Sequence, residues 1–165
     1  MRIGFYAPLK SPFSDSASGD RSLARLLISA LEIGGHEVLL MSEFRSVAIS
    51  GDELQQQGLA HQGQKVVSDM LDDPNHMVHS IDIWLTYHLY HKAPDWLGPQ
   101  ASEALNIPYV VTEASYAPKQ IAGPWQLGIK QVEKCLSVAS GVISLNPRDV
   151  ECIQPLLKPK AKQLL

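Results

Sequence analysis

The sequence has few of the features that mark secreted or membrane-spanning proteins. It has only two cysteines, Cys135 and Cys152, which lie outside any metal-type spacing and suit a reducing cytoplasm. No apolar run approaches the roughly 20 residues that span a bilayer. The apolar start at residues 2–7 is too short for a signal peptide and is ended by Pro8. We therefore expect a cytoplasmic protein.

The sequence also lacks an excess of basic residues. It has 14 basic and 17 acidic residues, a formal net charge of −3, whereas proteins that bind nucleic acid usually show a strong basic excess. We therefore expect no nucleic-acid partner. With 165 residues, 45% of them hydrophobic, the chain can bury the core of one domain.

The first 41 residues follow the pattern of a βαβ unit. A buried strand is predicted at residues 2–7, followed by a polar loop at residues 8–19. Apolar residues then recur at three- and four-residue spacing from Leu23 to Leu31, which predicts an amphipathic helix. Gly34-Gly35 is expected to end this helix, and a strand at residues 36–41 completes the unit. Such crossovers are right-handed and form parallel sheet.

The same alternation continues to the end of the chain. Helices are predicted at residues 51–71 and 97–105 and after Gly123-Pro124, and strands at residues 81–86, 107–112 and 141–145. Five strands alternating with helices predict an α/β fold with a Rossmann-like, doubly wound, mainly parallel sheet of about five or more strands.

The last residues indicate a domain boundary. A short helix around residues 148–157 precedes a basic, proline-marked segment at residues 158–163, and Leu164-Leu165 begins another apolar stretch. We expect residues 1–157 to form the Rossmann-like domain and residues 158–165 to begin a linker to a further domain.

Candidate ligand-binding residues follow the first predicted strand, because ligands of open parallel sheets bind beyond the carboxyl ends of the strands. Lys10 lies in the first loop, and Ser18-Gly19-Asp20 stands at the entry to the first helix. Unpaired N–H groups at a helix start suit an anion such as phosphate. The alternative is an ordinary capped helix, with Ser18 as the N-cap.

Two histidines, His88 and His91, follow the third predicted strand. Histidine titrates near neutrality, so either side chain can orient or deprotonate an acceptor hydroxyl. The spacing also fits a pair of metal ligands, but no third ligand stands at a helpful distance in the sequence. A structural, hydrogen-bonded histidine is the other alternative.

Three more polar residues follow the later strands. Glu113 ends the fourth predicted strand and can hydrogen-bond a sugar or position a loop, and Lys119 follows in the next loop. Asn146 comes after the fifth strand and can cap the next helix or contact a ligand. Together with Lys10, these three residues are candidates for binding an acceptor or a sugar.

Several segments carry a more specific pattern that extends over nearly the whole chain. They read MRIGFYAPLKSP at residues 1–12, SGDR at 18–21, ARLL at 24–27, GHEV at 35–38, HKAPDWLGP at 91–99, IPYVVTEAS at 107–115 and AGPW at 122–125. The opening segments resemble the start of GT4-type (group 1) glycosyltransferases, and the later ones resemble a bacterial branch of that family.

The resemblance implies the GT-B fold, in which two Rossmann-like domains face a cleft. It also implies transfer with retention at the sugar, without an obligatory metal or other cofactor. In that family the N-terminal domain mainly holds the acceptor, and the C-terminal domain holds the nucleotide-sugar donor through basic residues and a Glu-x7-Glu motif. The resemblance places Ser18, Gly19 and Asp20 near the donor diphosphate, and His88 or His91 near the reacting sugar.

The sequence departs from the family in two respects. No second domain with its Glu-x7-Glu motif follows within the 165 residues, and Gly19 stands where many relatives carry two glycines. We therefore expect the acceptor-binding half of a glycosyltransferase, inactive alone, whose partners are a nucleotide-sugar donor, an acceptor and the C-terminal domain. Self-association of this half and a peripheral membrane contact stay open.

The alternative from another class is a stand-alone Rossmann-type binding or partner subunit without catalysis of its own. A nucleotide-dependent reductase is disfavoured, because the first loop lacks the full glycine fingerprint of dinucleotide-binding proteins.

Overall fold

A single parallel sheet of six strands organises the chain in the computed structural model, which describes residues 1–165. The strands are β1 (Arg2–Tyr6), β2 (Glu37–Ser42), β3 (Ile83–Leu89), β4 (Tyr109–Ala114), β5 (Gly141–Ile143) and β6 (Lys162–Leu164). Their order in the sheet is β2-β1-β3-β4-β5-β6, and every neighbouring pair is parallel. The predicted fold class is confirmed.

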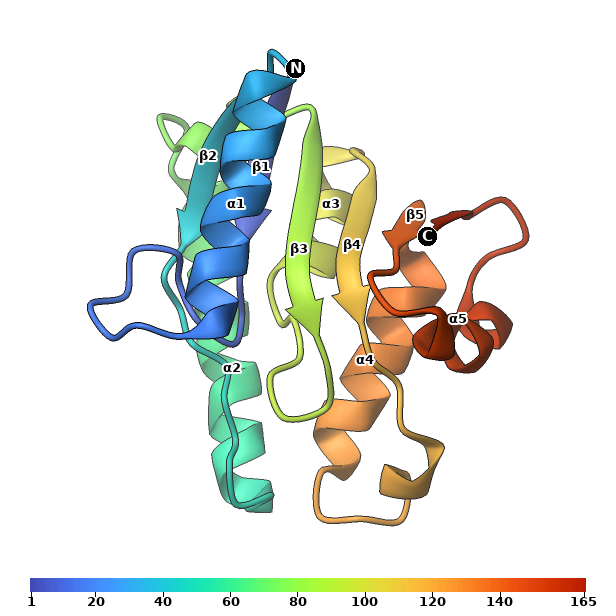
Figure 1. Cartoon of the computed structure of the whole chain (residues 1–165). Coiled ribbons are helices and arrows are strands. Elements are labelled where there is room, and N and C mark those ends of the chain that lie inside the picture. Colours follow the sequence, from blue (N-terminus) through green and yellow to red (C-terminus); the bar gives the residue numbers. More distant parts are fainter.

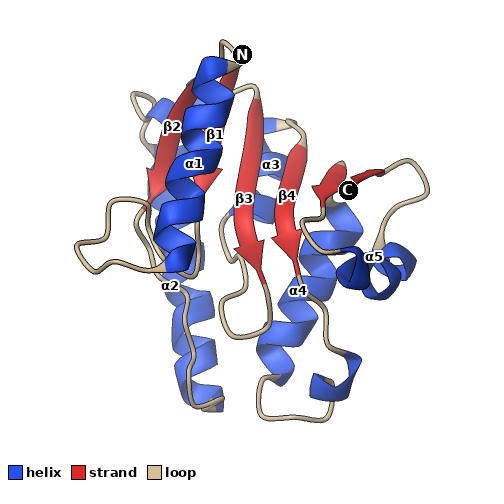
Figure 2. Ribbon diagram, viewed as in Figure 1, coloured by secondary structure: helices blue, strands red, loops and turns tan.

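The helices lie between the strands along the chain. They are α1 (Gly19–Ile33), α2 (Glu53–Asp72), α3 (Gly98–Leu105), α4 (Gln126–Val138) and α5 (Pro147–Ile153), with short 3-10 helices η1 (Met77–Ser80), η2 (Pro118–Gln120) and η3 (Gln154–Leu156). As Figures 1 and 2 show, α1 covers the sheet in front of β1, whereas α2, α3 and α4 lie behind the sheet.

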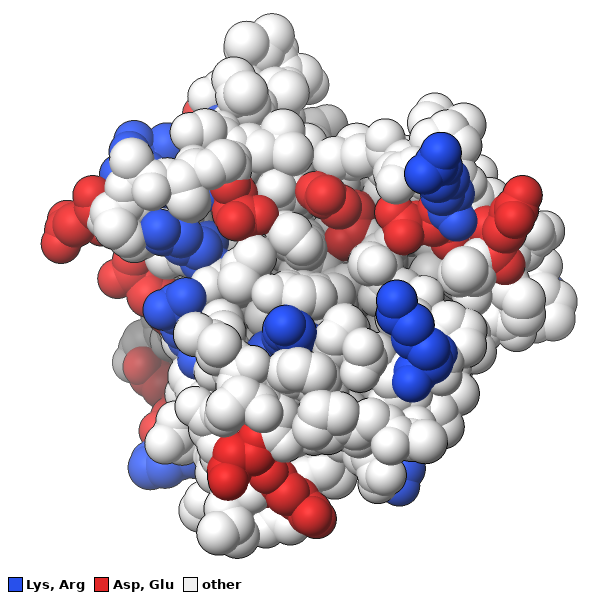
Figure 3. Space-filling view, turned by 60° about the horizontal axis from the view of Figure 1, so that its bottom comes forward, with Lys and Arg blue, Asp and Glu red and all other residues white.

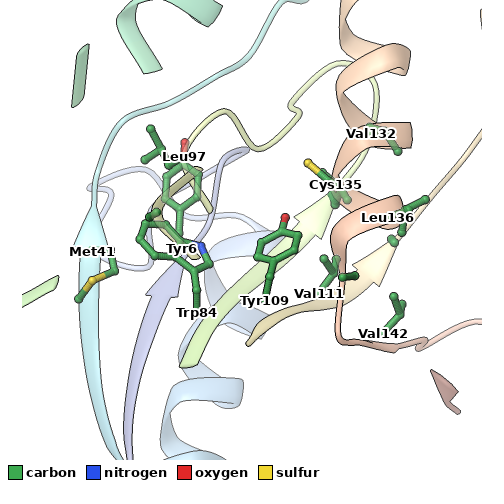
Figure 4. Close-up of a cluster of buried hydrophobic side chains, with 14 of the residues drawn as sticks. Tyr6, Met41, Trp84, Leu97, Tyr109, Val111, Val132, Cys135, Leu136 and Val142 are labelled. Atoms are coloured by element: carbon green, nitrogen blue, oxygen red, sulfur yellow. The ribbon is translucent and has the colours of Figure 1, made fainter. Parts of the chain in front are cut away.

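Two apolar cores fill these layers. The smaller core joins α1 to the front of the sheet through Ala24, Phe5 and Leu85. The larger core joins the back of the sheet to α2, α3 and α4, and its largest fully buried side chains include Trp84 and Tyr109. Figure 4 shows part of this larger core, where strand residues face side chains of α4. Because both faces of the central strands are covered, these strands read as nearly continuous apolar runs.

The first helix ends where the sequence predicts. Gly35 has a φ of 81°, a left-handed conformation that glycine adopts without steric cost, and β2 begins at Glu37 directly afterwards. At the other end of α1, Ser18 is the N-cap, and its hydroxyl accepts a hydrogen bond from the backbone N–H of Arg21 at 3.2 Å.

The structure differs from the sequence-based expectation at several strand ends. The third strand extends to Leu89 and the fourth to Ala114, so His88 and Glu113 belong to strands rather than to the loops that follow. Within the segment expected to begin a linker, residues 162–164 pair with β5 as an edge strand. None of the helices is long and apolar enough to cross a membrane.

Candidate functional site

The order of the strands reverses between β1 and β3. From β1 the chain moves to β2 on one side, and all later strands are added on the other side. At such a switch point the loops leave the sheet in opposite directions and open a crevice at the carboxyl ends of the strands. These ends lie at the lower edge of the sheet in Figure 1, where α1 also begins.

Two residues beside this point have an unusual backbone. His88 in β3 has a φ of 62°, and Glu113 in β4 has a φ of 58°. The register pairs Tyr87 with Thr112 and Leu89 with Ala114, so His88 and Glu113 occupy matching positions on neighbouring strands. A left-handed residue other than glycine is uncommon, less so for Asn, Asp and His than for Glu, and costs about 1–3 kcal/mol, a kind of strain that gathers at functional sites.

This conformation turns both side chains towards the α1 side of the sheet. Tyr87 belongs to the core beneath α1, and simple alternation would place Leu89 on that same face. Leu89 instead lies in the core on the opposite face, and so does Ala114 of β4. The alternation of side chains between the two faces therefore breaks at His88 in β3 and at Glu113 in β4. A regular strand would direct the imidazole of His88 to the back of the sheet, away from α1.

The imidazole of His88 contacts the first turn of α1. Its Nδ1 atom lies 2.8 Å from the Oδ1 atom of Asp20, and the two side chains are 22% and 35% exposed. An ionised carboxylate can only accept a hydrogen bond, so Nδ1 carries the shared proton. In the neutral form of this tautomer, Nε2 carries a lone pair and can accept a hydrogen bond from a ligand hydroxyl.

Tyr87 and Glu113 extend this group across the sheet. Burial, together with the negative charges of Glu113 and Asp20, raises the pKa of Tyr87 far above its ordinary value, so its hydroxyl keeps its proton and acts as a donor. The Oε2 atom of Glu113 is buried and has no hydrogen-bond partner within the chain. The Tyr87 hydroxyl interacts with the Glu113 carboxylate, so these two side chains and the Asp20–His88 pair form one polar group on this side of the sheet.

His91, the second candidate, lies in a different environment. Its ring packs edge-on against Trp125, with ring centroids 5.5 Å apart, and its Nε2 atom is buried without a partner. Burial, and then the charge of Lys92, lowers the pKa of His91, so the ring is neutral at pH 7. Gly128 of α4 packs so closely against the carbonyl of His91 that no side chain would fit there.

Hydrogen bonds to backbone carbonyls join the loop that holds His91 to its neighbours. The N–H of Ala48 donates to the carbonyl of Lys92 at 2.8 Å, and the hydroxyl of Ser46 donates to the carbonyl of Pro94 at 2.6 Å. The indole of Trp125 donates to the carbonyl of Ala48 at 2.6 Å. The loops after β2, β3 and β4 therefore form one connected wall, of which His91 is a part.

The first loop is held by arginines. Arg21 donates to the carbonyl of Ser14, Arg25 to that of Pro12 and Arg45 to that of Leu9. The Ser18 hydroxyl is occupied as a helix cap, whereas Gly19 has open space around it and, as the first helical residue, has a backbone N–H without an intrahelical partner. The predicted anion site at this helix start stays a prediction.

The other predicted residues lie away from the Asp20–His88 pair. Lys10 lines a separate hollow of about 280 Å³ together with Ser11, Ser14, Ser16, Glu43 and Arg45. Lys119 lies exposed in η2 and forms no hydrogen bond or ion pair. The Oδ1 atom of Asn146 accepts from the N–H of Arg148 at 3.1 Å and so caps α5. No cluster of three or more His, Cys, Asp or Glu side chains is arranged to hold a metal ion.

The face around the crevice has mixed charge. In Figure 3, acidic and basic side chains both appear on this face, and several of opposite charge lie next to one another. A hollow of about 440 Å³ lies elsewhere, at the amino ends of β4 and β5, where residues 106–109 and Ser140 line it. The volume of a hollow therefore does not point to the Asp20–His88 pair, whereas the left-handed backbone and the paired side chains make it a candidate site.

The sequence predicts His88, Asp20 and Glu113 as candidate site residues, but it does not show that their side chains lie close together. It gives no sign that Tyr87 belongs to the same group. A tyrosine inside an apolar strand gives no sign that its hydroxyl faces two carboxylates from other elements. In comparisons with known proteins, no family matches the sequence, and no curated protein matches it either. Function must therefore be inferred from the chemistry of these side chains.

Proposed function

We propose that this chain is the acceptor-binding half of a retaining glycosyltransferase that moves a sugar from a nucleotide-sugar to an acceptor hydroxyl. The observation that carries the proposal is the Asp20–His88 pair at the switch point of the sheet, with Nδ1 and Oδ1 2.8 Å apart. The resemblance of the sequence to GT4-type enzymes supports the same conclusion independently.

His88 has the chemistry that sugar transfer requires. A sugar presents hydroxyl groups, and a neutral imidazole can accept a hydrogen bond from a hydroxyl without adding a charge to the site. Asp20 favours the tautomer in which Nε2 is the acceptor and stabilises the ring if it gains a proton. The lowered pKa of His91 keeps its ring neutral at pH 7, and the ring packs edge-on against Trp125. The proposed role of His91 is therefore to support the wall formed by the loops after β2, β3 and β4.

The donor needs groups that this half does not supply. A departing diphosphate is stabilised by several donors or cations aimed at its oxygens. Arg21, Arg25 and Arg45, which hold the first loop, are instead bonded to backbone carbonyls. The free N–H groups at the start of α1 are the only contribution we assign to this half, and the remaining donors belong to the proposed C-terminal domain.

The test is a screen of nucleotide-sugars and acceptors with the full-length gene product and, in parallel, with the 165-residue chain. We expect transfer by the full-length protein and none by the chain alone. Failure of the full-length protein to transfer any sugar, while it still binds acceptors, would support the alternative of a binding or partner subunit. Transfer by the chain alone would contradict the assignment of the donor site to another domain.

A further inference from the structure

The hollow of about 440 Å³ at the amino ends of β4 and β5 contains a buried polar group without a partner. Ser102 of α3 lines this hollow, is only 4% exposed, and has a hydroxyl that forms no hydrogen bond within the chain. A buried hydroxyl without a partner costs free energy, because nothing replaces the water that it has lost. The amino ends of these strands lie at the edge of the sheet opposite to the crevice (Figure 1).

Three charged side chains line the same hollow, and two of them are lysines. Lys134 comes from α4, Lys158 from the segment before β6, and Glu103 from α3. Neither Lys134 nor Glu103 takes part in an ion pair. The ammonium of Lys158 donates to the carbonyl of Val138 at 3.2 Å, which uses one of its three N–H groups. Both lysines therefore keep donors for a negatively charged ligand.

The basic segment near the end of the sequence lies beside this hollow. Residues 158–162 carry three lysines and no acidic residue. Lys158 lines the hollow, and the backbone N–H of Lys162 donates to the carbonyl of Ser140, another lining residue, at 3.1 Å. The pairing of β6 with β5 therefore holds a basic segment next to the hollow. A concentration of one sign of charge beside a hollow favours a ligand of the opposite sign.

We infer that this hollow binds a small phosphorylated molecule with hydroxyl groups, such as a sugar phosphate. A phosphate group carries a charge of about −1.5 to −2 at pH 7 and has three strong acceptor oxygens, which suit the ammonium groups of Lys134 and Lys158. The carboxylate of Glu103 can only accept, so it suits a hydroxyl of the same ligand, and the Ser102 hydroxyl can donate or accept. The volume lies within the range of about 300–1,000 Å³ that is typical of small-molecule sites.

The test measures the binding of three probes to the 165-residue chain by NMR titration. The probes are glucose 6-phosphate, glucuronate and glucose, which share a sugar ring and differ in charge. We expect glucose 6-phosphate to bind at least about 10-fold more tightly than either of the others, because it alone carries a phosphate. Its binding should shift the backbone amide signals of Ser102 and Ser140, which line the hollow.

Three variants test the assigned residues. Lys134 and Lys130 are both exposed on α4, one turn apart, but only Lys134 lines this hollow. K134Q should weaken the binding of glucose 6-phosphate by at least about 10-fold, whereas K130Q should change it by less than about 2-fold. S102A should weaken binding by about 3–10-fold, although the free chain should be at least as stable as the wild type, because the variant removes a buried hydroxyl without a partner.

Several results would overturn the inference. They are no detectable binding of glucose 6-phosphate, equal affinity for glucose or glucuronate, equal effects of K134Q and K130Q, and an S102A variant that binds as tightly as the wild type. Amide signals that shift at Asp20 and His88 instead would place the ligand in the crevice and would also overturn it. Because the hollow and the crevice lie at opposite edges of the sheet, none of these outcomes depends on whether the protein transfers a sugar.

Discussion

Asp95 offers a direct test of the packing behind the site. It is completely buried in the loop before α3, and its carboxylate accepts four hydrogen bonds. The donors are the N–H groups of Leu97 at 2.7 Å and Gly98 at 2.8 Å, the Thr86 hydroxyl at 2.6 Å and the Tyr109 hydroxyl at 3.0 Å. These bonds connect β3, β4 and α3 around one side chain.

Replacing Asp95 with alanine should lower the free energy of unfolding by about 3–5 kcal/mol. Each buried donor left without a partner costs about 1–3 kcal/mol. The two N–H groups cannot turn away, whereas the two hydroxyls can rotate and recover part of their loss. Domains of this kind are stable by about 5–15 kcal/mol, so D95A should still fold. D95N, which keeps an acceptor for the N–H groups, should cost about 1–2 kcal/mol.

The effect should also depend on pH. Burial raises the pKa of Asp95 above its ordinary value, although its hydrogen bonds oppose the shift. Because its pKa is higher in the folded chain, Asp95 contributes most to the stability at a pH below its pKa in the unfolded chain. This contribution is lost as the pH rises through the pKa of Asp95 in the folded chain. Asparagine does not titrate, so the difference in the free energy of unfolding between the wild type and D95N should increase as pH falls from 7 towards about 4.

Urea unfolding followed by circular dichroism measures these differences. D69N is the control, because it removes an exposed ion pair with Lys65 and should change the stability very little. A D95A variant within about 1 kcal/mol of the wild type would refute the reasoning, since the two buried N–H groups alone should cost more than that when they lose their acceptor. If the difference in the free energy of unfolding between the wild type and D95N becomes smaller at low pH, the pKa of Asp95 is not raised in the folded chain.

Two further predictions concern packing and thiol reactivity. G128A should destabilise the chain by about 3 kcal/mol in thermal or urea unfolding, because its Cβ would overlap the carbonyl of His91, whereas G58A, in open space on α2, should stabilise it by about 0.5–1 kcal/mol. The reverse order would show that α4 does not pack on this loop. A thiol reagent should modify exposed Cys152 in the native chain and reach Cys135 only on unfolding, because burial removes Cys135 from solvent and raises its pKa. Rapid native labelling of Cys135, detected by mass spectrometry, would contradict its burial.

Much of the fold was predictable because the apolar pattern is strong. The spacing from Leu23 to Leu31 marks α1, and the strand–helix alternation marks a parallel sheet. The sequence does not predict the pairing of β6 with β5, because lysines and Pro159 dominate residues 158–162 and short, charged edge strands have little apolar signal. The ends of β3 and β4 were placed too early because polar residues follow the apolar runs there.

The candidate site was predictable only in part. The rule that ligands bind at strand carboxyl ends selects His88 and Glu113, but Asp20 and His88 are 68 positions apart, and no local pattern predicts that they pair. The sequence likewise does not show the left-handed backbone of His88 and Glu113, because no glycine marks either position. Tertiary contacts impose both features, and they give His88 and His91 different surroundings.

The proposed function is tested most directly by the kinetics of sugar transfer in the full-length gene product with H88A and H91A. His88 faces the crevice and pairs with Asp20, so H88A should lower kcat by about 10²–10⁴-fold, the usual range for a positioned proton-handling group, without loss of folding. His91 packs against Trp125 in the wall, so H91A should have a smaller effect on kcat. Unchanged kcat and acceptor KM in H88A, or a larger loss in H91A, would contradict the assignment of His88 to the reacting sugar.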